Sequence, residues 1–179
     1  MINKNDVRNL AKSFSYAFSG ILYCIKNERN MRIHLCMTVL VSFFAYFFRV
    51  TQTEYIILVL CFAMVIMSEM VNTAIETLTN LESPSYNNLA RIAKDVAAGA
   101  VCVVAIATVI VGGFIFFKAD KLYDTLQVII TNPIYIALFI VLIILSILFT
   151  FNGAKLFDEP KTKVYHMKNY DDKNINKKN

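Results

Sequence analysis

Two carboxylates lie inside an otherwise apolar segment, in the run Ser68-Glu69-Met70-Val71-Asn72-Thr73-Ala74-Ile75-Glu76. On a helix, Glu69 and Glu76 share one face because they are seven residues apart, and Asn72 lies between them on that face. If Tyr55 marks the outer boundary of a membrane span, Glu69 lies roughly 21 Å inward and Glu76 roughly 31 Å inward, at the inner edge of a core about 30 Å thick. An ionisable group at the depth of Glu69 costs about 2.5–3.5 kcal/mol to insert, and it usually marks a function.

Three further charged residues, Glu28, Lys94 and Asp95, belong at the same inner boundary, because they flank or open the neighbouring apolar segments. Carboxylates at such a boundary suit Mg²⁺, which takes one or two of them together with substrate phosphates, and a lysine suits a phosphate. A buried carboxylate such as Glu69 suits a general base that acts on a group in the lipid phase. The combination predicts phosphoryl transfer at a membrane surface, although the sequence contains no G-x-x-x-x-G-K-[ST] loop and no soluble-kinase signature.

The elements that position these residues are long apolar helices. Of the 179 residues 57% are apolar and 17% charged, and the mean hydropathy is +0.53. Spanning helices are expected near residues 32–49, 54–81, 90–117 and 133–152. These features exclude a soluble globular enzyme, and the four singly spaced cysteines exclude a disulfide scaffold. The predicted fold class is therefore an all-α membrane protein.

Charge and amphipathicity predict the topology. Residues 1–31 carry apolar side chains at helical spacing on one face, which is typical of an interfacial helix on the inner leaflet, although that face could also pack on the other helices. Of the 18 Lys and Arg residues, only Arg49, Lys118 and Lys121 fall on the other side of the membrane. Both termini are therefore expected in the cytoplasm. No motif or basic patch indicates nucleic-acid binding.

Three motifs carry a resemblance to a known family. They are Asn27-Glu28-Arg29-Asn30, Glu69-x-x-Asn72-Thr73-Ala74-Ile75-Glu76, and Ala93-Lys94-Asp95-x-Ala97-Ala98-Gly99-Ala100-Val101. In order, spacing and predicted depth they resemble the prokaryotic integral-membrane diacylglycerol kinases, over about residues 5–117. The continuation of the first motif to Ile33-His34 is similar to the Gram-positive branch, whose members are mostly undecaprenol kinases.

The resemblance implies an amphipathic surface helix and three spanning helices in a homotrimer, with active sites shared between neighbouring subunits. It implies transfer of the γ-phosphate of Mg-ATP to the primary hydroxyl of a lipid in the bacterial cell membrane. Glu69 is then the catalytic base, and Glu28 and Glu76 bind Mg²⁺. The nucleotide site comprises Tyr16, Glu28, Asn72, Glu76, Lys94 and Asp95. Arg8 matches an early family arginine with an offset of one residue, and Gly99 fits a position where two helices approach closely. Together with Glu69, these two residues are assigned to the binding site of the lipid substrate.

The expected organisation has five parts. It comprises an interfacial helix at 1–31, a three-helix kinase core at 32–117, an extracytoplasmic loop at 118–132, an extra spanning helix at 133–152 and a polar cytoplasmic tail at 153–179. Undecaprenol is the expected acceptor and diacylglycerol the alternative. Two readings of another class stay open: a small channel or proton-coupled transporter with Glu69 as the relay, and a structural membrane protein in which the carboxylates make interhelical hydrogen bonds.

Overall fold

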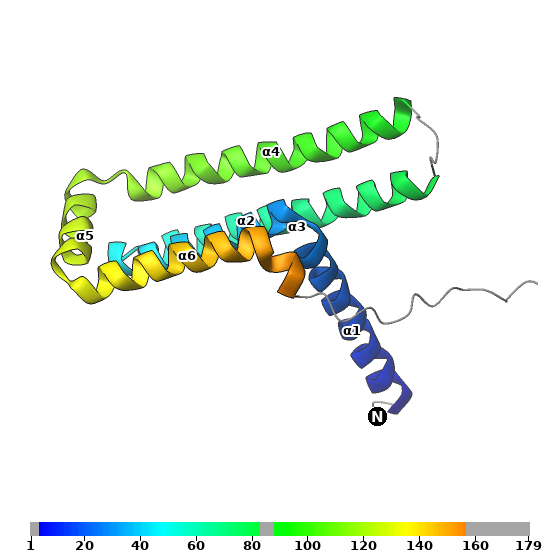
Figure 1. Cartoon of the computed structure of the whole chain (residues 1–179), viewed down its shortest axis with the longest axis horizontal. Helices are drawn as coiled ribbons and strands as arrows, with labels where there is room; N and C mark the ends of the chain where they lie inside the picture. The colour runs from blue at the N-terminus through cyan, green and yellow to red at the C-terminus, as the bar shows by residue number, and fades with distance from the viewer. Residues whose placement is uncertain (1–3, 83–87, 157–179) are drawn as a thin grey trace, which may run out of the picture.

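The computed structural model describes residues 4–82 and 88–156, and this part of the chain is all-helical (Figure 1). The helices are α1 Lys4–Asn27, α2 Arg29–Phe48, α3 Gln52–Glu82, α4 Asn88–Phe116, α5 Ala119–Thr131 and α6 Pro133–Leu156. Four of them, α2, α3, α4 and α6, are long and apolar enough to cross a membrane. The predicted all-α membrane fold, with a fourth helix of spanning length near the C-terminal end of the described residues, is confirmed. The expected cytoplasmic loop around Pro84 and the tail beyond Leu156 lie outside the described residues.

Helix α3 packs against both α4 and α2, and α2 also packs against α6, with α3 and α4 running antiparallel (Figure 1). A small apolar core forms around Ala45, Leu58 and Ile115, where α2, α3 and α4 meet. Phe116 of α4 stacks edge-on against Phe48 of α2, with ring centroids 5.2 Å apart. Only a small part of α4 and α6 is buried within the chain. Their outer apolar faces therefore need lipid or another subunit to cover them.

The first helix meets the bundle at an elbow centred on Glu28. This residue has extended backbone angles, φ −103° and ψ 118°, so α1 ends at Asn27 and α2 begins at Arg29, three residues before the expected start of the span. From the elbow α1 projects away from the bundle (Figure 1). Its first turns expose Val7, Leu10 and other large apolar side chains, whereas its last turn packs against the long helices. The last turn of this helix thus packs on the bundle, and lipid contact of the exposed first turns stays a prediction.

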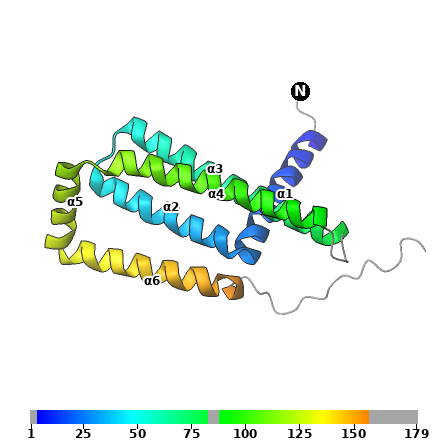
Figure 2. The same ribbon diagram turned by 90° about the horizontal axis from the view of Figure 1, so that it is seen from above.

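The segment 118–132, expected as a loop, contains the helix α5, which lies transverse to the long helices at the far end of the bundle (Figures 1 and 2). Leu122, Thr125 and Ile129 are its inward-facing positions, at spacings of three and four residues. The expected loop is therefore a helix, and its outer positions include both polar residues such as Asp124 and Gln127 and exposed apolar ones such as Tyr123 and Ile130. Lys118 pairs with Glu54 and ties the start of α5 to the start of α3.

Candidate active site

The candidate site begins with the polar stripe on α3. Glu69 is only 2% exposed, Asn72 and Thr73 are also buried, and Glu76 is half-buried. The side-chain amide of Asn72 donates a hydrogen bond to Glu76 Oε1 at 3.0 Å, and the Thr73 hydroxyl donates to the Glu69 carbonyl at 3.0 Å. Helical periodicity alone places these groups on one face, and the Asn72 amide fixes the position of the Glu76 carboxylate.

Glu69 faces a histidine that the sequence analysis left without a role. His34 Nε2 of α2 lies 3.3 Å from Glu69 Oε1. The distance suits an ion pair, but the geometry does not make a hydrogen bond, and Oε1 has no hydrogen-bond partner within the described residues. Asn72 Oδ1 is likewise buried without a partner there. Because buried polar atoms are normally satisfied, these two oxygens indicate a place where a ligand supplies a proton donor or a cation.

Glu28 brings a third carboxyl group to the same region from the elbow. It is half-buried, and its pKa is raised by burial and then by the nearby charges of Glu76 and Glu69, whereas Arg32 lowers it. Three carboxyl groups that repel one another beside an unpartnered amide oxygen fit a hard divalent cation, which prefers oxygen ligands. Among the described residues no group of three His, Cys, Asp or Glu side chains is arranged as a complete metal site. Oxygen ligands from a phosphate or from water would therefore have to complete the coordination.

Of the two α4 residues predicted at this boundary, one lies near the α3 stripe and the other does not. Lys94 Nζ donates to Asn80 Oδ1 at 2.6 Å, and Asn80 is one helical turn beyond Glu76 on α3. Asp95 is 66% exposed and pairs instead with Arg91 on its own helix, at 3.2 Å. A substrate phosphate bound near Glu76 would therefore lie near Lys94, whereas Asp95 faces away from the polar stripe on α3.

The remaining predicted residues are not brought to the carboxylates within this chain. Tyr16 is 73% exposed on α1, and Arg8 is also exposed on that helix. Gly99 is exposed, and a Cβ added there would meet no atom within 4 Å. The close helix approach expected at Gly99 is therefore absent within the described chain, because Ala97 and Val101 are the α4 residues buried in this part of the helix.

An apolar cavity leads away from the Glu69–His34 contact into the centre of the bundle. It has a volume of about 300 Å³ and lies between α2, α3 and α4. Its lining includes His34 and Thr38 of α2, Phe62 and Val65 of α3, and Val109 of α4. Glu69 does not itself line the cavity, but His34, which does, lies 3.3 Å from the Glu69 carboxylate, and Val65 is one turn before Glu69 on α3. This arrangement suits an apolar chain whose polar end meets Glu69.

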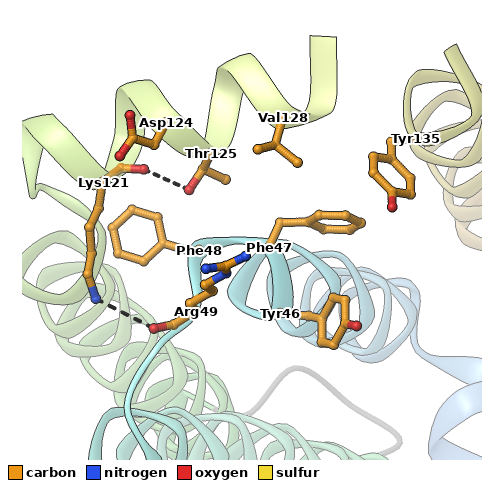
Figure 3. A pocket seen from close by; sticks show the side chains of 9 residues that line it. All are labelled: Tyr46, Phe47, Phe48, Arg49, Lys121, Asp124, Thr125, Val128 and Tyr135. Carbon is orange, nitrogen blue, oxygen red and sulfur yellow. Dashed lines mark hydrogen bonds between the residues drawn. The ribbon is translucent and has the colours of Figure 1, made fainter. Parts of the chain in front are cut away.

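A second cavity, of about 580 Å³, lies at the opposite end of the bundle, between the end of α2, α5 and the start of α6 (Figure 3). Aromatic side chains including Phe47, Phe48 and Tyr135 form much of its wall. Lys121 reaches across it to the Arg49 carbonyl, at 3.5 Å, and its ammonium group lies 5.8 Å from the Phe48 ring centre. It contains none of the carboxylates of the α3 stripe, so it is separate from the candidate active site.

These features define an integral membrane protein with a carboxylate-lined site at one end of its helical bundle. The chain matches the family described as prokaryotic diacylglycerol kinase over residues 15–116, more than half of its length, and it belongs to that family. It is 43% identical over 106 residues, 59% of the chain, to a diacylglycerol kinase of Synechocystis sp., and spans 61% of that relative's length. It is 34% identical over 114 residues, 64% of the chain, to an undecaprenol kinase of Bacillus subtilis, and spans 93% of it. No solved structure matches the chain. The family match ends at Phe116, so α5 and α6 lie outside it.

Proposed function

We propose that this protein is an ATP-dependent lipid kinase that transfers the γ-phosphate of ATP to the primary hydroxyl of a membrane lipid, and that undecaprenol is the acceptor. The observation that carries the proposal is the environment of Glu69. Its carboxylate is buried beside His34, which lines the apolar cavity, and its Oε1 has no hydrogen-bond partner within the described residues. A lipid alcohol that enters from the cavity supplies the missing donor.

In the proposed reaction, the lipid hydroxyl donates a hydrogen bond to Glu69 Oε1 and then its proton. The alcohol oxygen forms a bond to the γ-phosphorus as the bond from phosphorus to the β-bridging oxygen breaks, so lipid phosphate and ADP are the products. Because Glu69 is almost fully buried, bulk water does not compete as the acceptor of that proton or of the phosphoryl group. His34 contacts the carboxylate from the α2 side.

Mg²⁺ is the proposed metal, and Glu28 and Glu76 are its proposed protein ligands, with the free Asn72 Oδ1 beside them. Bound there, Mg²⁺ would neutralise charge on the phosphates of ATP. Lys94 is assigned to a phosphate as a point charge.

Asp95 and Tyr16 are assigned to the nucleotide, and Arg8 and Gly99 to the lipid side. These four residues are exposed within one chain, and the outer face of α4 is largely uncovered. We therefore propose a homotrimer in which neighbouring subunits bring such residues to the carboxylates. The distribution of Lys and Arg supports a plasma-membrane topology with both termini in the cytoplasm.

The lining of the cavity favours undecaprenol over diacylglycerol. Two of its lining residues, Thr38 and Thr108, carry a hydroxyl, and Thr38 already donates to the His34 carbonyl at 2.9 Å, which leaves Thr108 and His34 as the polar groups of the lining. The ester carbonyls of a diacylglycerol would therefore find few donors there, whereas an isoprenoid alcohol has no polar group beyond its hydroxyl. The relative from Bacillus subtilis is named an undecaprenol kinase, and that from Synechocystis sp. a diacylglycerol kinase.

The test is a side-by-side phosphorylation assay of the purified full chain with radiolabelled ATP and either lipid in the same mixed micelles. A higher kcat/KM for undecaprenol supports the proposal, and a higher value for diacylglycerol replaces the acceptor. Absence of phosphate transfer to both lipids, with protein that is folded and assembled, would overturn the kinase assignment in favour of a channel or structural role.

A further inference from the structure

Arg32 of α2 is a buried arginine whose guanidinium group joins three helices. It is 6% exposed. Its Nη1 donates to the carbonyls of Ile25 and Lys26, at 2.9 and 3.0 Å, in the last turn of α1. Its Nε donates to the Thr150 carbonyl of α6, at 3.1 Å. The carbonyls at the end of a helix have no partners within the helix, so Arg32 closes the end of α1 and holds it to α6.

The fit between Arg32 and α6 depends on Gly153. A Cβ added at this glycine would lie 2.6 Å from Arg32 Cδ and 3.3 Å from its Nε, which is too close for the arginine to keep its position. The neighbouring contact extends the same interface, because Cys36 Sγ of α2 donates to the Ser146 carbonyl of α6 at 3.5 Å. Helix α6 is therefore seated directly on the Arg32 side chain.

The elbow that Arg32 closes carries Glu28. The Glu28 side chain makes no capping hydrogen bond at the start of α2. Its backbone is held by a hydrogen bond from its N–H to the Cys24 carbonyl, at 2.8 Å, and by a longer one, 3.4 Å, from the Arg32 N–H to its own carbonyl. The direction in which Glu28 points thus depends on how the end of α1 sits on α2, and the Arg32 guanidinium fixes that arrangement.

We infer that α6 is part of the catalytic apparatus rather than a plain membrane anchor: through Gly153 and Thr150 it seats Arg32, and Arg32 positions the elbow so that Glu28 faces Glu76. The inference rests on the proposed function, in which these two carboxylates hold the Mg²⁺ of ATP. Arg32 is a positioning residue, since its Nε and Nη1 donors bind backbone carbonyls of α6 and α1.

Two substitutions test the inference in the full chain. Gly153→Ala places a methyl group against Arg32, and Arg32→Lys keeps the charge but replaces the planar fork by a single ammonium group that cannot serve the carbonyls on both helices. Gly113→Ala is the matched control, because a Cβ at Gly113 meets no atom within 4 Å. Both test variants should raise the KM for Mg-ATP about tenfold, the equivalent of losing one or two charge-assisted hydrogen bonds at the elbow, while the KM for lipid stays unchanged.

A second readout follows the elbow without turnover. Cys24 lies in the last turn of α1, is 5% exposed, and has a pKa raised by burial, so its thiol is poorly reactive while the elbow is closed. In a background with Cys36→Ser, Cys61→Ala and Cys102→Ala, the rate of Cys24 alkylation by N-ethylmaleimide reports elbow opening. Gly153→Ala and Arg32→Lys should raise this rate about tenfold over Gly113→Ala, by the same loss of hydrogen bonds.

Each outcome has a defined meaning. A rise of the KM for Mg-ATP but not of the KM for lipid, together with faster Cys24 alkylation, supports the inference. If the Arg32→Lys protein fails to assemble, the results for Gly153→Ala decide the test. Values equal to those of Gly113→Ala in both readouts overturn it, as does an equal rise of the KM for lipid and for Mg-ATP, which would indicate general damage. A wild-type chain without lipid kinase activity would instead refute the proposed function, and the alkylation rates would still report whether α6 controls the elbow.

Discussion

Replacement of Glu69 by glutamine should abolish most turnover while leaving the fold and the binding of both substrates intact. The side chain is 2% exposed, and glutamine has nearly the same volume, so the substitution opens no cavity in the bundle. The amide can still contact His34 Nε2, which lies 3.3 Å from the present carboxylate oxygen. What is lost is the ability to accept the proton of the lipid alcohol.

The expected loss is that of a general base. Removal of such a group reduces the rate by about 10²–10⁴-fold, or about 2.7–5.4 kcal/mol of transition-state stabilisation. The upper part of this range is expected here, because the buried position leaves little water to take over the role. The neighbouring carboxylates Glu28 and Glu76 cannot replace Glu69, since in the proposed site they are engaged by the metal and the phosphates.

The assay measures kcat and both KM values with radiolabelled ATP and undecaprenol in mixed micelles, with oligomeric state checked by size-exclusion chromatography. Glu54→Gln is the control, since it makes the same chemical change on the same helix but at the other end, beside Lys118. The control should keep its kcat within about twofold, as is usual for a substitution that touches no reacting group. Near-wild-type turnover of Glu69→Gln would refute the base assignment. Loss of assembly only in Glu69→Gln would favour a structural hydrogen-bonding role.

Three further outcomes are expected. Glu28→Gln and Glu76→Gln should each raise the apparent KM for Mg-ATP and the Mg²⁺ requirement by about tenfold or more, because Mg²⁺ needs anionic oxygen ligands; unchanged Mg²⁺ titrations in both would remove the metal assignment. Gly112→Leu should fill the apolar cavity and raise the KM for lipid, while the KM for ATP stays constant; Gly113→Leu, at a glycine absent from the residues lining that cavity, is the control, and equal effects would show that the cavity does not hold the lipid. Deletion of residues 119–179 should leave a chain that inserts and keeps measurable kinase activity with a raised KM for Mg-ATP; full wild-type kinetics would show that α6 does not act on the elbow.

The fold was accessible from the sequence because its determinants are local. The uncharged run from Val96 to Phe117 is long enough to cross a bilayer, where a helix pairs all its backbone polar groups internally. The spacing of apolar residues in 1–31 matches the period of a helix with one apolar face. The stripe of Glu69, Asn72 and Glu76 follows in the same way from the helical period. The helix α5 was missed although seven of its 13 residues are apolar, because the segment is too short for a membrane span and polar residues such as Lys121, Asp124 and Gln127 interrupt its apolar positions.

The contacts between helices in the site could not be predicted from the sequence, because the hydrophobic period of a helix does not specify which of its residues meets which residue of another helix. His34 showed in the sequence only as a polar interruption of an apolar run, and its contact with Glu69 requires the register between α2 and α3. A usable signal exists nonetheless: two ionisable residues in neighbouring spans are each costly alone, and they are expected to meet.

Arg32 illustrates the same limit at longer range. In the sequence it is one of several cations before the first span, where the positive-inside rule already accounts for its charge. Its position in the structure is different from that of a solvated charge, because its Nε and Nη1 groups donate to carbonyls of α6 and α1, and one of these partners is 118 residues away. The helix that supplies this partner also places a glycine where any side chain would collide with the arginine. A segment that hydropathy assigns as an anchor is thus joined by hydrogen bonds to the elbow that carries Glu28, and the chemistry of the kinase core depends on contacts that begin outside it.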